Sequence, residues 1–144
     1  MTKLRDAGHV RELGPAEELT PDELQGWYIP YHVVHSSGKY GLVFHGSFEY
    51  NGQNLNRELL AGPTLHSPLI DVLLCFRLRR VAVSGDMTAM FHQVRLSPTD
   101  RRTFRILCWD EDRTTWLVLE WTVLPFGATC SPEPKLIWFH KFTL

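Results

Sequence analysis

The sequence has few of the features that identify secreted, membrane-spanning or cysteine-rich proteins. Its 144 residues contain only three cysteines, with no Cys-x-x-Cys pair, which argues against a disulfide framework or a cysteine-rich zinc site. No run of about 18 apolar residues occurs, so we expect no membrane span. The polar stretch from Met1 to Leu13 does not resemble a signal peptide. We therefore expect an intracellular protein whose cysteines pack as small apolar residues.

Common nucleotide-binding and catalytic motifs are also missing. The chain has no Gly-x-Gly-x-x-Gly and no Gly-x-Ser-x-Gly sequence. Ser36–Lys39 lacks the leading glycine of a phosphate loop, because position 33 is a valine. His32 and His35 lie three residues apart in a predicted strand and turn, which places their side chains on opposite faces. Two histidines are also too few for a closed zinc site, so we do not expect one there.

The composition is that of one globular domain with an uneven charge distribution. Hydrophobic residues make up 44% of the chain and charged residues 22%, which excludes wholesale disorder. Residues 1–26 carry three basic and six acidic side chains, whereas residues 27–144 carry twelve and ten. We expect an acidic tail or linker over residues 1–26, a main domain over residues 27–132 and a divergent segment over residues 133–144. The weakly basic main part is compatible with a nucleic-acid partner.

Local patterns predict an α+β fold. Aromatic and β-branched runs predict two hairpins, formed by residues 27–34 with 40–44 and by residues 104–109 with 115–121. Three helix-start signals, at Thr20, Ser67 and Ser97, predict short helices. The second helix is apolar nearly all round, so we expect it to be buried. Hairpins followed by alternating helix and strand indicate the α+β class.

The segment from Val81 to Leu96 has the most chemical content. Asp86 ends a short apolar run that predicts a strand. A carboxylate at the end of a strand is held rigidly beside an open turn, where it can bind a metal ion. Asp86 can also simply cap the following turn, and the residue pattern alone favours that interpretation.

Six blocks of sequence follow one another between residues 27 and 132. They are residues 27–34, Asn54–Pro63, Leu73–Arg77, Asp86–Val94, Asp100-Arg101 with Arg105–Trp109, and Phe126-Gly127 with Ser131-Pro132. In these blocks and their order, residues 27–132 resemble the reverse transcriptase region of BEL/Pao-type retrotransposon polyproteins. The resemblance implies fingers and the first half of a ferredoxin-like palm, incomplete at the C-terminus. It also implies RNA-directed DNA polymerase chemistry, a nucleotidyltransfer, on an RNA or DNA template-primer and a deoxynucleoside triphosphate (dNTP).

The same resemblance implies a magnesium site and a nucleotide pocket. Asp86 would bind two Mg²⁺ ions, helped by the backbone carbonyl of Met87. Phe91 matches the position whose ring excludes a ribose 2′-hydroxyl group. Phe126 and Gly127 would lie beside the nascent base pair, with the glycine leaving room for the nucleotide. Core packing is the alternative interpretation for both phenylalanines.

Arginines are concentrated in the same part of the chain. Seven occur in the 29 residues from Arg77 to Arg105. Arg101, Arg102 and Arg105 are our candidates for contacts with the nucleic-acid backbone. A solvated charged face is the plain alternative.

The chain also departs from the family pattern. Gly41 and His45 stand where the family has an arginine and an aspartate, and that arginine contacts the triphosphate. The resemblance fades after Pro132, and the sequence has no Tyr-x-Asp-Asp hairpin to supply further metal carboxylates. We therefore expect this chain alone not to polymerise DNA. A nucleic-acid-binding module and a retroelement remnant without function are the alternative interpretations.

Overall fold

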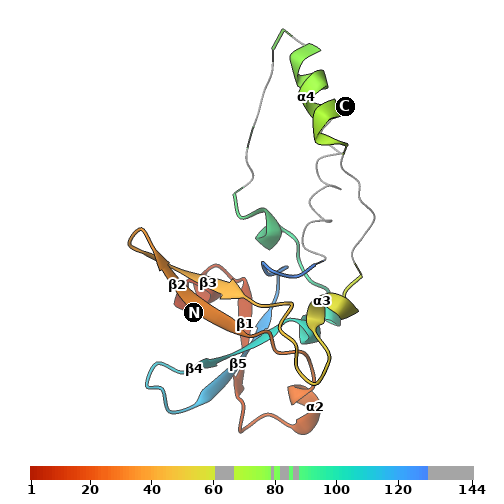
Figure 1. Ribbon diagram of the computed structural model, residues 1–144. Helices are drawn as coiled ribbons and strands as arrows, with labels where there is room; N and C mark the ends of the chain where they lie inside the picture. Colours follow the sequence, from red (N-terminus) through yellow and green to blue (C-terminus); the bar gives the residue numbers. More distant parts are fainter. Residues whose placement is uncertain (61–66, 79, 82–84, 86–87, 130–144) are drawn as a thin grey trace.

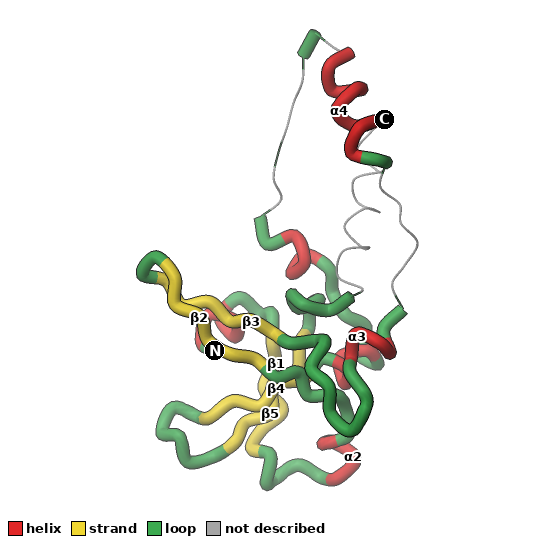
Figure 2. The backbone as a smooth tube through the Cα atoms, in the orientation of Figure 1, coloured by secondary structure: helices red, strands yellow, loops and turns green. Residues whose placement is uncertain are grey.

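The computed structural model describes residues 1–60, 67–78, 80–81, 85 and 88–129. These residues form two antiparallel sheets and several short helices (Figures 1 and 2), which confirms the α+β class. The elements are α1 (Thr2–Asp6), β1 (Val10–Pro15), α2 (Pro21–Leu24), β2 (Tyr31–Ser36), β3 (Lys39–Phe44), α3 (Leu55–Glu58), α4 (Leu69–Leu78), the 3₁₀ helices η1 (Met90–Gln93) and η2 (Asp100–Thr103), β4 (Arg105–Trp109) and β5 (Trp116–Trp121).

The larger sheet has the strand order β1-β5-β4, and all its pairings are antiparallel. Its β4–β5 hairpin confirms the predicted hairpin over residues 104–121. A polar turn separates two apolar runs there, and Asp110 accepts hydrogen bonds from the backbone and the side chain of Thr114. Next to the turn, Trp109 and Trp116 stack with ring centroids 3.8 Å apart. The register pairs Arg105 with Glu120.

The amino-terminal segment is part of this sheet, so the expectation of a tail over residues 1–26 needs correction. Strand β1 pairs with the free edge of β5, and Val10 lies opposite Trp121. Gly14 and Pro15 weaken the strand signal in the sequence, but an edge strand tolerates both residues. The register shifts between Glu12 and Gly14, as in a β-bulge. Helix α2 follows with the predicted capping box between Thr20 and Glu23.

The smaller sheet is the β2–β3 hairpin, which closes through Ser37 and Gly38, both at positive φ. The predicted strand over residues 27–34 begins later, at Tyr31, because the preceding residues bind the other sheet. The amide of Ile29 donates to the Arg105 carbonyl at 2.8 Å, and the Arg105 amide donates to the Trp27 carbonyl at 3.1 Å. These bonds attach the hairpin to strand β4.

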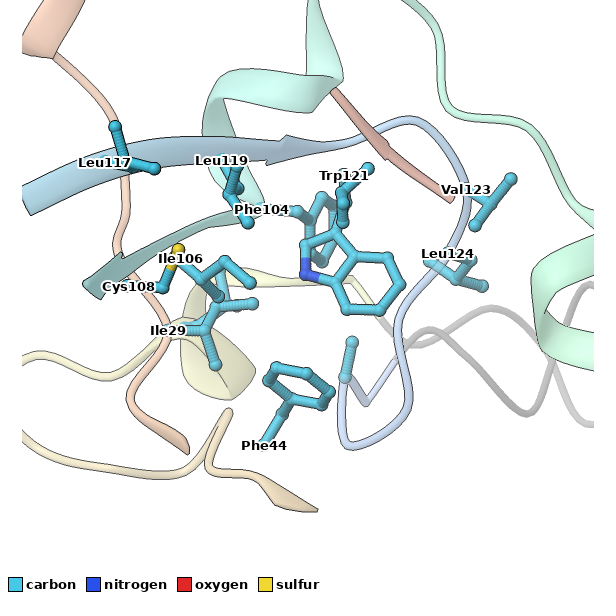
Figure 3. Packing of buried hydrophobic residues seen from close by; sticks show 13 residues of the cluster. Ile29, Phe44, Phe104, Ile106, Cys108, Leu117, Leu119, Trp121, Val123 and Leu124 are labelled. Atoms are coloured by element: carbon cyan, nitrogen blue, oxygen red, sulfur yellow. The ribbon is translucent and has the colours of Figure 1, made fainter. Parts of the chain in front are cut away.

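The hydrophobic core lies between the larger sheet and the base of this hairpin (Figure 3). Trp121 is fully buried, and its ring meets the ring of Phe44 edge to face at 5.2 Å. Other members of the core are Ile29, Leu55, Phe104, Ile106, Leu117, Leu119, Val123 and Leu124. Cys108 is buried as expected, whereas Cys75 is exposed and Cys130 lies outside the described residues.

Helix α4 forms where it was predicted, but the expectation that it is buried is wrong. Its apolar side chains are exposed, with Leu69 at 73% and Leu78 at 79%, and the helix stands away from both sheets (Figure 1). An apolar surface on every side of a helix predicts burial without defining the partner. In the described part of the chain, no helix is long and apolar enough to cross a membrane.

Candidate functional site

Asp86 and Met87, the predicted Mg²⁺ ligands, lie outside the described residues, as does most of the predicted strand that precedes them. Within the described ranges, no three histidine, cysteine or acidic side chains come together as a metal site. The magnesium site therefore stays a prediction.

Phe91 and Phe126 are in contact. They are two of the predicted nucleotide-binding residues, and the β4–β5 hairpin separates them in the sequence. Their ring centroids are 4.6 Å apart and the ring planes are inclined by 66°. Phe91 belongs to η1, and Phe126 follows β5. Phe126 is 43% exposed and Phe91 is half-buried, so the pair lies at the edge of the core with one face open to solvent.

Backbone hydrogen bonds hold the two segments together. The Leu124 amide donates to the Val94 carbonyl, and the Leu96 amide donates to the Thr122 carbonyl, both at 2.9 Å. This short pairing runs alongside the Phe91–Phe126 contact and fixes the relative position of the two rings. The contact is therefore part of a folded backbone arrangement.

His92 extends the aromatic cluster, and sequence analysis did not select it. Its ring contacts Phe126 with centroids 4.8 Å apart, Trp121 at 5.7 Å and His9 at 4.3 Å. Its Nε2 atom is buried and has no hydrogen-bond partner among the described residues. Burial lowers the pKa of His92, and the neighbouring His9 lowers it further. The neutral ring is thus the form that fits this position.

Gly127 has a packing role that is independent of any nucleotide. Its φ is +91°, and a Cβ atom there would lie 2.7 Å from the Phe44 carbonyl oxygen. The Asn56 side chain donates to the Gly127 carbonyl at 3.1 Å and accepts from the Thr129 amide at 2.8 Å. These contacts fasten the loop after β5 to the end of β3 and to α3. The residue pattern around Asn56 indicates no partner for its side chain.

The three predicted nucleic-acid arginines have different environments. Arg102 is exposed, and its guanidinium lies 3.8 Å from the Asp22 carboxylate. Arg101 is half-buried, and its Nε donates to the Leu96 carbonyl at 3.3 Å. These two side chains, both on η2, remain candidates for a phosphate contact.

Arg105 is a structural residue, which corrects its assignment as a nucleic-acid contact. It is 3% exposed, and its guanidinium donates to Glu120 Oε1 at 3.0 and 3.2 Å. It also donates to the carbonyls of Glu23 and Gln25, at the end of α2. Arg11 completes the group, with its Nη2 2.7 Å from Glu120 Oε2. All of these contacts lie within the protein. Strand pairing places Glu120 opposite Arg105, which brings its buried carboxylate to the guanidinium.

No protein-family model matches the sequence, and no curated protein shows significant similarity to it.

Proposed function

We propose that residues 27–132 are the fingers and the first half of the palm of a retroelement reverse transcriptase of the BEL/Pao type. The observation that supports this most is the contact between Phe91 and Phe126. Two separate motif blocks assign these residues to one nucleotide pocket, and the fold brings their rings to 4.6 Å. Sequence proximity does not explain this contact, because the whole β4–β5 hairpin separates the two positions.

In this proposal the aromatic pair forms one wall of a site for a dNTP. A ring at position 91 excludes a 2′-hydroxyl group by its volume and offers it no hydrogen-bond partner. The neighbouring ring at position 126 is partly exposed and can pack against the base or the sugar. Arg101 and Arg102 would contribute positive charge for the template-primer backbone.

The proposal for this chain is binding, without turnover. We propose that Asp86 and the Met87 carbonyl contribute to the Mg²⁺ site. One carboxylate is too few to hold two such ions. The described residues supply no cluster of further ligands.

Photo-crosslinking of a nucleotide to the full chain tests this proposal. The protein is mixed with an RNA–DNA primer-template, Mg²⁺ and either 4-thio-dUTP or 4-thio-UTP, and the crosslinked peptide is mapped by mass spectrometry. We expect labelling near residue 91 or 126, with the deoxynucleotide favoured by at least about tenfold. Phe91→Val should remove the preference. Phe48→Ala is the matched control, because Phe48 is 51% exposed and lies outside the pair.

Equal labelling by both nucleotides, or a preference that survives Phe91→Val, would overturn the pocket. Another set of results would favour the alternative function, a module that binds nucleic acid without catalysing a reaction. In that case RNA or DNA binding would survive Asp86→Ala, fall on charge reversal of Arg101 and Arg102, and occur without nucleotide labelling.

A further inference from the structure

The base of the β2–β3 hairpin brings two histidines into contact on its outer face. His32 Nδ1 and His45 Nε2 are 2.6 Å apart, and the rings stack with centroids 4.7 Å apart and planes inclined by 21°. The register explains this, because Tyr31 lies opposite Phe44, so positions 32 and 45 are diagonal neighbours. Tyr31 and Phe44 pack against one another toward the core, which leaves both histidines exposed on the opposite face.

The backbone holds both histidines in place before any ligand binds. His32 lies within the paired strand β2. The His45 amide donates to the Pro30 carbonyl at 2.9 Å, and the His45 carbonyl accepts from the Phe48 amide at 3.1 Å. Only side-chain rotation is therefore needed to adjust the two nitrogens, and a site that is largely formed in advance loses little entropy on binding.

The two facing nitrogens can share one proton, since one neutral ring donates and the other accepts. The same two atoms can bind a divalent ion, and imidazole is a good ligand for zinc, copper and nickel. Metal–nitrogen bonds of about 2.0–2.1 Å place two ligand nitrogens about 2.9 Å apart at a right angle and about 3.4 Å apart at a tetrahedral angle. The two nitrogens would therefore have to separate by about 0.3–0.8 Å from their 2.6 Å contact.

We propose that His32 and His45 form a surface site for one borderline divalent ion of the copper or zinc type, with water in the remaining coordination positions. His35 is not part of this site, because it lies on the other face of the strand, as its spacing from His32 predicts, and packs against Tyr40 at 4.7 Å. The bound ion would join β2 to the segment after β3, and would so stabilise the base of the hairpin. This site does not depend on the proposed binding of a nucleotide.

Titration of the full chain with Cu²⁺ and with Zn²⁺ tests the site, by calorimetry and, for copper, by electron paramagnetic resonance. We expect one ion per chain with two imidazole nitrogens, together with a higher melting temperature when the metal is present. His32→Ala and His45→Ala should each weaken binding by at least about tenfold, since even an outer-sphere partner of a metal site contributes that much. His35→Ala and His9→Ala are matched controls that should bind as the unmodified chain does.

His32→Ala and His45→Ala change exposed side chains, so far-UV circular dichroism should show an unchanged fold. The site is refuted if His32→Ala and His45→Ala bind the ion as tightly as the unmodified chain. Equal weakening by His35→Ala would refute it as well, because that result would show distributed binding by surface histidines.

Discussion

Replacing Arg105 by alanine should destabilise the fold strongly, even though sequence analysis places this residue at a nucleic-acid surface. The guanidinium is 3% exposed and binds the buried Glu120 carboxylate and the carbonyl groups of Glu23 and Gln25. Its removal leaves a carboxylate buried with one partner fewer and two carbonyl groups without their donor. The variant therefore loses stability through uncompensated polar groups.

Removing one partner of a buried ion pair typically costs about 3–5 kcal/mol. Glu120 keeps its 2.7 Å contact with Arg11, so we expect the lower end of that range, about 3 kcal/mol. Such a loss is a large share of the stability of a small domain, which is about 5–15 kcal/mol. The exposed Arg102 is the matched control, because its 3.8 Å pair with Asp22 should contribute about 0.5 kcal/mol or less.

Urea denaturation followed by tryptophan fluorescence measures both variants, since Trp121 lies at the centre of the core. Arg105→Ala should lower the midpoint markedly, and Arg102→Ala should leave it nearly unchanged. The double variant Arg105→Ala/Glu120→Ala should lose less than the sum of the single variants, because the two side chains interact. An Arg105→Ala midpoint close to that of Arg102→Ala would refute the buried ion pair as a structural element.

Three further predictions follow from the cluster and the loop beside it. Because the pKa of His92 is lowered in the folded state, the unfolded chain binds more protons, and stability should fall as the pH drops from 7 to 5. The urea midpoint measured across this range should fall for the unmodified chain, and it should change less with pH in His92→Gln. Asn56→Ala should lower the free energy of unfolding by about 1–2 kcal/mol in urea denaturation and speed hydrogen exchange of the Thr129 amide. Unchanged exchange would argue against the hydrogen bond between Asn56 and Thr129. Gly127→Ala should lower the melting temperature more than Gly38→Ala does, because both glycines have positive φ but only the new Cβ at position 127 meets the Phe44 carbonyl; equal losses would indicate backbone strain alone.

Sequence reasoning succeeded where the signal was local. The capping box of α2 and the β4–β5 hairpin each need only a short stretch of chain, namely a cap with its third neighbour or two apolar runs around a polar turn. Strand β1 was missed because its strand character comes from pairing with β5, not from its own composition. Helix α4 forms from its own sequence, but its burial depends on a partner that the sequence does not name.

In the candidate site, too, some residues could be selected from the sequence and others could not. Motif order singled out Phe91 and Phe126, and the fold brings them together. Arg105 was assigned wrongly because its partner Glu120 is set by the strand register, which a charge pattern does not contain. His92 and Asn56 were missed because a ring among aromatic rings and an amide between two backbone groups become visible only in three dimensions.

The pairing of β1 with β5 has a consequence for the timing of synthesis. Trp121, the partner of Val10 across the sheet, is added to the chain about a hundred residues after Val10. At roughly 5–20 residues per second this delay is about 5–20 s, during which the amino-terminal strand leaves the ribosome without its neighbour. The β4–β5 hairpin, in contrast, needs only its own turn to close. Pairing of β1 with β5 is therefore the non-local step in forming the larger sheet, and we expect it to be slower than closure of the hairpin.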